Sequence, residues 1–235
     1  MHHVVLERWS RGTSFLHARD ARVKLLLLVV YLAALATTAP LSAVAAACYA
    51  ALVASAILAA RLPIAGLAWR AAAVLPFAGA FALLSLLAGD AGRAASLVVK
   101  SYLSAAAVLT LAWATPLPKL VRGLESLGVP RFLTLTVQFL YRYLFVISEQ
   151  AQHMRLAALA RGGRLRLAHA AGAVATLFGR SYARAEGIHG AMLARGFRGH
   201  IEPLSQPRLD AADFLFLAAG LAASAALRLT LGAAR

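Results

Sequence analysis

The chain has 235 residues, 61% of them hydrophobic, and a mean hydropathy of +0.74. This apolar share exceeds the roughly 45–50% of ordinary soluble domains and excludes a typical soluble fold. Lys and Arg outnumber Asp and Glu by 24 to 9, so the net charge is +15. Together, hydropathy and charge indicate an integral membrane protein whose basic residues face one compartment. The single cysteine, Cys48, excludes an intramolecular disulfide framework and a cysteine-rich zinc module.

Five apolar blocks predict five transmembrane helices and therefore an all-α polytopic membrane protein, because a span needs about 20 apolar residues. The blocks cover residues 25–39, 41–60, 71–88, 94–114 and 211–229. Pro40 separates the first two blocks almost without a loop, so we expect a tight helical hairpin. A basic start followed by an apolar block also resembles a secretory signal peptide. The basic start is unusually long and a second apolar block follows at once, so we expect the first block to remain as a span.

The distribution of basic residues predicts the orientation of the spans. Twenty of the 24 Lys and Arg residues fall in three segments, residues 1–24, 61–70 and 115–210. Five spans with a cytoplasmic N-terminus put all three segments on the same side. Because Lys and Arg concentrate in cytoplasmic loops, this side is the cytoplasm.

A sixth apolar stretch, residues 132–147, is not expected to cross the membrane. It is short, and Arg142 lies in its middle, where an arginine at the bilayer centre would cost about 2.5–3.5 kcal/mol. Crossing would also move the arginines that follow it to the outside. We expect a long helix that lies under the membrane face or partly within it.

The basic segment 115–210 keeps helical spacing of its apolar residues. Thr115 and Pro116 have the residue types of an N-cap and first helical position, and Gly128 ends that helix. Further helices are expected from about residue 131 to 160 and from about 172 to 194. Asp210 is expected to cap the last span, with Asp213 in its first turn. The predicted domains are residues 1–114 (tail and four spans), 115–210 (cytoplasmic helical domain) and 211–235 (last span).

Both long helices of this segment are expected to end in the same tripeptide, Ala-Arg-Gly. Glycine is common just past a helix end, and arginine in the last turn complements the helix dipole, so a purely local explanation exists. Alternatively, a guanidinium on a rigid helix end, between small neighbours, suits carboxylates on a partner protein. The local sequence leaves both explanations open. The candidate partner-binding residues are Ala160, Arg161, Gly162, Ala194, Arg195 and Gly196.

Motifs for independent chemistry are missing from the sequence. No Gly-Lys dipeptide occurs, so the chain holds no phosphate-binding loop of the common NTPase type. No H-E-x-x-H, C-x-x-C or G-x-S-x-G occurs either, and no catalytic residue or metal site is predicted. No charged residue lies in the middle of a predicted span, since Lys100 is near the outer end of its span and can reach the interface. A self-sufficient channel or secondary transporter is therefore disfavoured.

Longer strings around these motifs resemble a known family. They are residues 16–24 (LHARDARVK), 124–130 (LESLGVP), 141–146 (YRYLFV) and 191–197 (AMLARGF). Together with the paired Ala-Arg-Gly ends they resemble the T component of energy-coupling factor (ECF) transporters, over essentially the whole chain. The resemblance is strongest to the cobalt-type subunit, CbiQ. One departure is Gly163, a second glycine after the first motif.

The resemblance implies a non-catalytic coupling subunit of an ATP-driven importer in the bacterial inner membrane. It would join two ABC ATPase subunits (CbiO-like), which bind the ATP, to a substrate-binding membrane subunit (CbiM-like, possibly with a CbiN-like protein). By analogy, Arg161 and Arg195 each enter a groove on one ATPase, and this chain itself holds no cofactor.

The resemblance favours Co²⁺ as the transported substrate. Nickel, biotin or another vitamin remain alternatives, because the substrate is selected by another subunit of such transporters. From a different class, a membrane-bound enzyme acting on an anionic lipid or phosphorylated substrate is a second hypothesis. Nucleic-acid binding is disfavoured because the basic segment is expected to lack interleaved exposed aromatic residues and has no recognisable reading motif.

Overall fold

The computed structural model describes residues 12, 14–38, 42–162, 167–199 and 210–232, and within these ranges the regular structure is helical without a strand. The all-α prediction is therefore confirmed. The chain forms two compact units. We call Met1–Leu127 together with Pro207–Arg235 the membrane unit, and Gly128–Gln206 the arginine unit. The predicted boundaries at residues 114 and 210 concern membrane topology and stay a prediction, and the expected turn at Pro40 lies outside the described residues.

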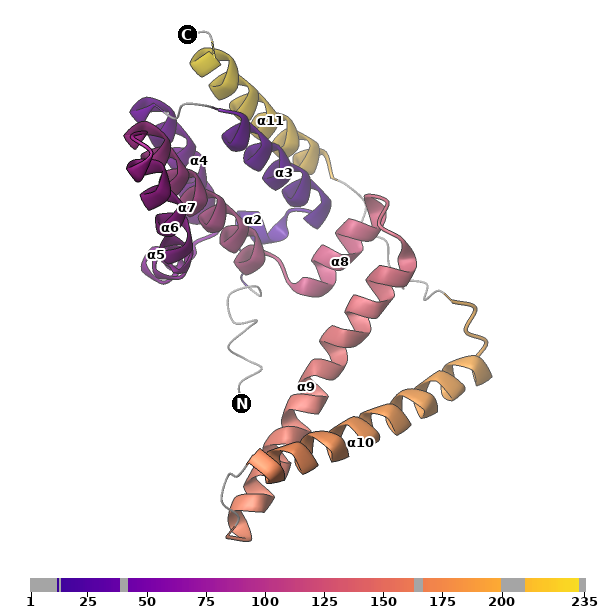
Figure 1. The fold of residues 1–235 in the computed structure, drawn as a ribbon. Helices are drawn as coiled ribbons and strands as arrows, with labels where there is room; N and C mark the ends of the chain where they lie inside the picture. Colours follow the sequence, from indigo (N-terminus) through magenta and orange to yellow (C-terminus); the bar gives the residue numbers. More distant parts are fainter. Residues whose placement is uncertain (1–11, 13, 39–41, 163–166, 200–209, 233–235) are drawn as a thin grey trace. The chain divides into compact units, whose positions relative to one another are not determined.

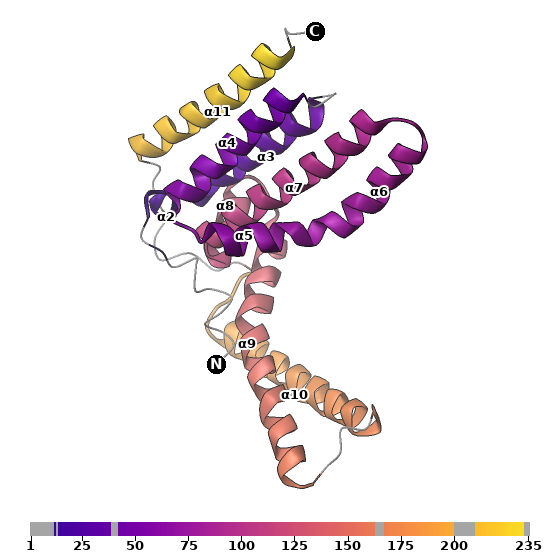
Figure 2. The same ribbon diagram turned by 90° about the vertical axis from the view of Figure 1, so that its left-hand side faces the viewer.

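The membrane unit is built around one central helix, α7 (Figure 1). Helix α7 packs against α3, α4, α5 and α6, while α3 also contacts α8 and α11. The view in Figure 2 shows α3, α4, α7 and α11 running roughly along one direction. The elements of this unit are α2 (Phe15–Ala18), α3 (Ala21–Thr37), α4 (Ala43–Ala59), α5 (Ile64–Ala71), the 3₁₀ turn η1 (Ala72–Val74), α6 (Leu75–Leu87), α7 (Ala91–Ala114), α8 (Leu117–Ser126) and α11 (Ala211–Gly232).

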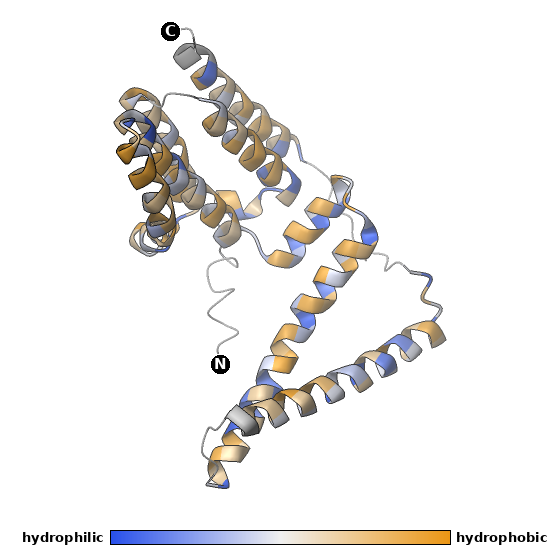
Figure 3. Ribbon diagram, in the orientation of Figure 1, coloured by the Kyte–Doolittle hydropathy of each residue, from blue (hydrophilic) through white to orange (hydrophobic). Residues whose placement is uncertain are grey.

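Three helical stretches are long and apolar enough to cross a membrane: Ile64–Leu87, Ala91–Ala114 and Ala211–Arg228. Helix α4 is a shorter apolar helix, and α3, like α4, has 17 residues. Large apolar side chains point away from the unit, including Trp69 at 82% and Leu87 at 78% exposure. Figure 3 shows hydrophobic residues covering most of α3, α4, α6 and α11. Such surfaces suit lipid, and the chain is an all-α polytopic membrane protein.

One predicted span begins earlier than expected. The sequence predicted a loop over residues 61–70 and a span from 71, whereas one helical stretch runs from Ile64 to Leu87, with η1 in its middle. Pro76 lies at the start of α6, where a missing N–H is tolerated. Arg70 had interrupted the apolar pattern, but its guanidinium carbon lies 4.9 Å from the centre of the Trp113 ring. The helix therefore continues through Arg70, whose side chain packs against Trp113 of α7.

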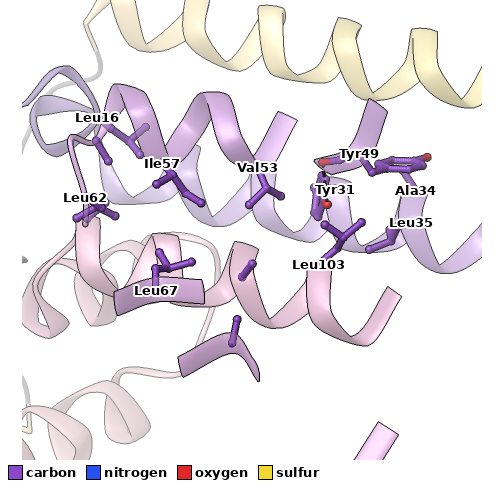
Figure 4. Packing of buried hydrophobic residues seen from close by; sticks show 14 residues of the cluster. Leu16, Tyr31, Ala34, Leu35, Tyr49, Val53, Ile57, Leu62, Leu67 and Leu103 are labelled. Atoms are coloured by element: carbon purple, nitrogen blue, oxygen red, sulfur yellow. Dashed lines mark hydrogen bonds between the residues drawn. The ribbon is translucent and has the colours of Figure 1, made fainter. Parts of the chain in front are cut away.

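The core of the membrane unit lies where α3, α4, α5 and α7 meet (Figure 4). Tyr49 and Leu35 are almost fully buried, at 0% and 1% exposure. The Tyr31 ring meets the Tyr49 ring edge-on, with centroids 5.8 Å apart, and its hydroxyl donates to the Tyr49 carbonyl at 3.3 Å. The Tyr49 hydroxyl in turn lies 3.0 Å from the Thr38 hydroxyl. The two tyrosines are therefore buried with their hydroxyl groups hydrogen-bonded.

Two lysines join α3 to α7 at both ends of their contact. The buried Lys24 ammonium, in the first turn of α3, donates to the Ala114 carbonyl at 3.4 Å and to the Thr115 hydroxyl at 3.1 Å. Lys100 of α7 donates to the carbonyls of Ala36 (3.3 Å) and Thr38. Each lysine thus binds the last carbonyls of the other helix, where a positive charge complements the dipole. The two helices must therefore run antiparallel.

The predicted N-cap role of Thr115 is wrong. Thr115 is the residue after α7, and Pro116 occupies the N-cap position of α8 without a side-chain cap. The threonine hydroxyl instead accepts a hydrogen bond from the Lys24 ammonium. Local sequence could not distinguish these roles, because the competing partner lies 91 residues away.

A buried carboxylate fixes the start of α11. The Ala211 amide donates to the Asp210 carboxylate at 2.8 Å, which agrees with the predicted capping role of Asp210. Asp213, in the first turn and 6% exposed, accepts the amides of Asp210 and Asp20, both at 3.3 Å. It also pairs with Arg19 at 3.5 Å. We call Arg19, Asp20 and Asp213 the α11 clasp, because they tie the last span to the start of α3.

Candidate partner-docking site

The arginine unit contains two long helices, α9 (Arg131–Ala160) and α10 (Leu167–Ala194), which contact each other. The structure confirms the predicted bounds of the first. The second begins at Leu167 rather than near residue 172, and the first Ala-Arg-Gly end is followed by residues outside the described ranges. Figure 1 shows the C-terminal ends of α9 and α10 at opposite ends of this helix pair.

At the end of α9, Arg161 is the C-cap residue and Gly162 has a φ of +71°. The Arg161 amide donates to the Ala157 carbonyl at 3.3 Å, and the Gly162 amide donates to the Leu159 carbonyl at 3.0 Å. Glycine is favoured here because a left-handed backbone conformation costs other residues about 1–2 kcal/mol. The helix therefore ends abruptly with the arginine on its rim.

At the end of α10, a complete Schellman turn surrounds Arg195. The Gly196 amide, at a φ of +80°, donates to the Leu193 carbonyl at 2.9 Å. The Phe197 amide donates to the Met192 carbonyl at 3.0 Å, which is the longer-range bond of this motif. The predicted role of the glycine in both tripeptides is thus confirmed, and it is compatible with a second role of the arginines in binding.

All six residues of the two tripeptides are exposed. Among the described residues, neither the Arg161 nor the Arg195 guanidinium has an ion-pair partner. Each presents unused donors at a helix end, flanked by an alanine and a glycine that leave room for another backbone. The two ends form two separate candidate sites instead of one patch. Their role in docking stays a prediction.

The charged residues of the arginine unit are mostly arginines. Its sequence holds ten arginines and three glutamates, with no lysine or aspartate. Arginine offers a planar fork that binds a carboxylate with two hydrogen bonds, whereas lysine acts as a point charge. This composition favours a partner with acidic grooves.

An apolar groove of about 680 Å³ lies between α9 and α10. It is lined by large side chains such as Phe132, Phe139 and Tyr143 of α9, and by Ile188 and Met192 of α10, with Phe197 beyond the end of α10. Polar groups on its lining include Gln150, Ser181, Arg184 and His189. The sequence analysis did not predict this groove. The amphipathic pattern of both helices, visible in Figure 3, was its only signal.

No group of three or more His, Cys, Asp or Glu side chains is placed to hold a metal ion in the described part of the chain. The prediction that this chain holds neither a metal nor a cofactor stays a prediction.

Comparison with known proteins agrees with the resemblance noted in the sequence. The family model for CbiQ, described as a cobalt transport protein, matches residues 12–206. The cobalt transport protein CbiQ of Rhodobacter capsulatus is 32% identical over 153 residues, which cover 58% of this chain and 63% of that relative. The alignment thus spans somewhat less than two thirds of the relative's length. Since the family model covers most of this chain, including both Ala-Arg-Gly helix ends, the chain belongs to the CbiQ family of cobalt transport proteins.

Proposed function

We propose that this chain is the transmembrane coupling (T) subunit of an ECF-type ABC importer that takes up Co²⁺. The observation that carries the proposal is the pair of exposed arginines, Arg161 and Arg195, on matched helix ends of one arginine-rich unit. Two equivalent projections suit two copies of one ATPase. The membrane unit would remain in the bilayer with its N-terminus and the arginine unit on the cytoplasmic side of the inner membrane.

In this proposal the chain is not an enzyme. ATP is bound by two partner ATPases (CbiO-like), and the cobalt ion by a separate membrane subunit (CbiM-like, with or without a CbiN-like protein). The acidic grooves of the ATPases receive the two guanidinium groups. Closure of the ATPases on ATP then moves α9 and α10, and this movement reorients the substrate-binding subunit.

Charge reversal at the two arginines tests the proposal. Each single variant, Arg161→Glu or Arg195→Glu, should weaken ATPase binding about tenfold or more, because a buried interfacial charge pair is replaced by repulsion. The double variant should lose ATPase co-purification and Co²⁺ uptake, while its amount in the membrane is unchanged. Competition of uptake by Ni²⁺ and biotin identifies the substrate.

Matched controls are available on the same helices. Arg155 of α9 and Arg180 of α10 are exposed arginines away from the helix ends. Arg155→Glu and Arg180→Glu make the same change in net charge and should retain co-purification and uptake. Wild-type uptake by the Arg161→Glu, Arg195→Glu double variant would refute the coupling role.

A further inference from the structure

The two Ala-Arg-Gly ends differ in the residue that follows them. After Gly196 comes Phe197, whereas after Gly162 comes Gly163, which has no side chain. Phe197 closes the Schellman turn through its amide, and its side chain lines the same groove as Met192, the residue whose carbonyl accepts that bond. An apolar contact between these two positions commonly accompanies the motif.

We infer that Phe197 is a positioning residue for Arg195, and that it preorganises the Arg195 end for a partner. Phe197 is half-buried while the arginine beside it is exposed. Its aromatic ring anchors the turn in the groove, and the turn fixes the direction in which the Arg195 backbone leaves the helix.

The energetic argument concerns the cost of ordering. A partner that binds a fraying helix end must immobilise both the turn and the arginine, which reduces the affinity. At the Arg195 end the turn is already ordered in the free chain, because Phe197 packs in the groove. Removing the phenyl ring should therefore weaken binding without removing any group that touches the partner.

The inference rests on the proposed function. Its experiment therefore includes one readout that needs no partner ATPase. Hydrogen exchange of the isolated chain reports whether the Gly196 and Phe197 amides are protected. We expect Phe197→Ala to raise their exchange rates at least severalfold, and Phe197→Leu, which keeps an apolar anchor, to restore protection. Phe178→Ala, at an exposed phenylalanine of α10, should leave the exchange of these two amides unchanged. Unchanged exchange in Phe197→Ala would overturn the inference.

The second readout is the affinity of the purified partner ATPase in an Arg161→Ala background, where only the Arg195 end remains. We expect Phe197→Ala to weaken this affinity about three- to tenfold, which corresponds to the cost of ordering one turn. Phe197→Leu should recover most of it, and Phe178→Ala should have no effect. Equal losses in Phe197→Ala and Phe178→Ala would contradict a positioning role.

The two proposals fail in different ways. If Arg195→Ala in the same background leaves ATPase binding intact, the docking role of Arg195 is wrong, whatever Phe197 does. If Arg195→Ala abolishes binding while Phe197→Ala has no effect on affinity, docking stands and the positioning role is overturned.

Discussion

Lys24 illustrates how one residue can connect distant parts of the membrane unit. A lysine in the first turn of a helix is unfavourable for that helix, because its charge opposes the positive end of the dipole. Lys24 is nevertheless 5% exposed, and its ammonium reaches the last carbonyl of α7. Lys24 therefore stabilises the C-terminal end of α7 and the packing of α3 against α7.

Replacing this lysine should destabilise the chain measurably. Lys24→Met keeps the length and most of the apolar stem but leaves the Ala114 carbonyl and the Thr115 hydroxyl without their donor. We expect the free energy of unfolding to fall by about 1–2 kcal/mol, seen as a lower thermal unfolding midpoint in detergent micelles. Arg122→Met, at an exposed arginine of α8, should change it by less than about 0.5 kcal/mol. Equal midpoints for the two variants would contradict the capping role of Lys24.

At the scale of elements, helix ends were more predictable than helix partners. Pro130 and Gly162 bracket α9, and its predicted bounds agree with the structure because both signals are local. By contrast, the sequence placed Arg70 in a loop, because its contact with Trp113 of another helix cannot be seen locally. Lys100 lies near the end of a predicted span, and the sequence did not show that it donates to carbonyls at the end of α3. Such tertiary contacts have no signature in the local sequence.

The same distinction applies to the candidate site. The two tripeptides could be found from the sequence because they repeat a local capping signal. The groove that receives Phe197 could not, because it exists only when α9 and α10 pack together. For this reason the sequence predicted no separate role for Phe197, although it belongs to the family-like stretch 191–197.

The α11 clasp makes a prediction about one element. Asp213 accepts two backbone amides and pairs with Arg19, whereas the Asp210 side chain binds one amide of its own helix start. Asp213→Ala should therefore lower the free energy of unfolding by about 2–3 kcal/mol, since it leaves the half-buried Arg19 and two backbone amides without their acceptor. Asp210→Ala should cost about 1 kcal/mol, as expected for an N-cap. Thermal unfolding of the two variants measures both, and a smaller loss for Asp213→Ala would contradict the clasp.

At the scale of the whole molecule, the proposed topology places the arginine unit in the cytoplasm. The single native cysteine makes this testable, because a Cys48→Ala chain can carry one new cysteine at a time. Ala91→Cys, at the exposed start of α7, and Arg155→Cys, on the exposed face of α9, mark the two sides. In intact spheroplasts a membrane-impermeant maleimide should label only the first, and permeabilisation should add the second. Labelling of Arg155→Cys in intact spheroplasts would refute the orientation.

The paired lysines between α3 and α7 have a mechanical consequence. Sliding one helix along the other by a single turn, about 5.4 Å, would remove both ammonium groups from their carbonyls at once. Shear between these helices is therefore opposed at two points, whereas rotation of the pair as a whole breaks neither contact. The two helices should therefore move as one rigid element.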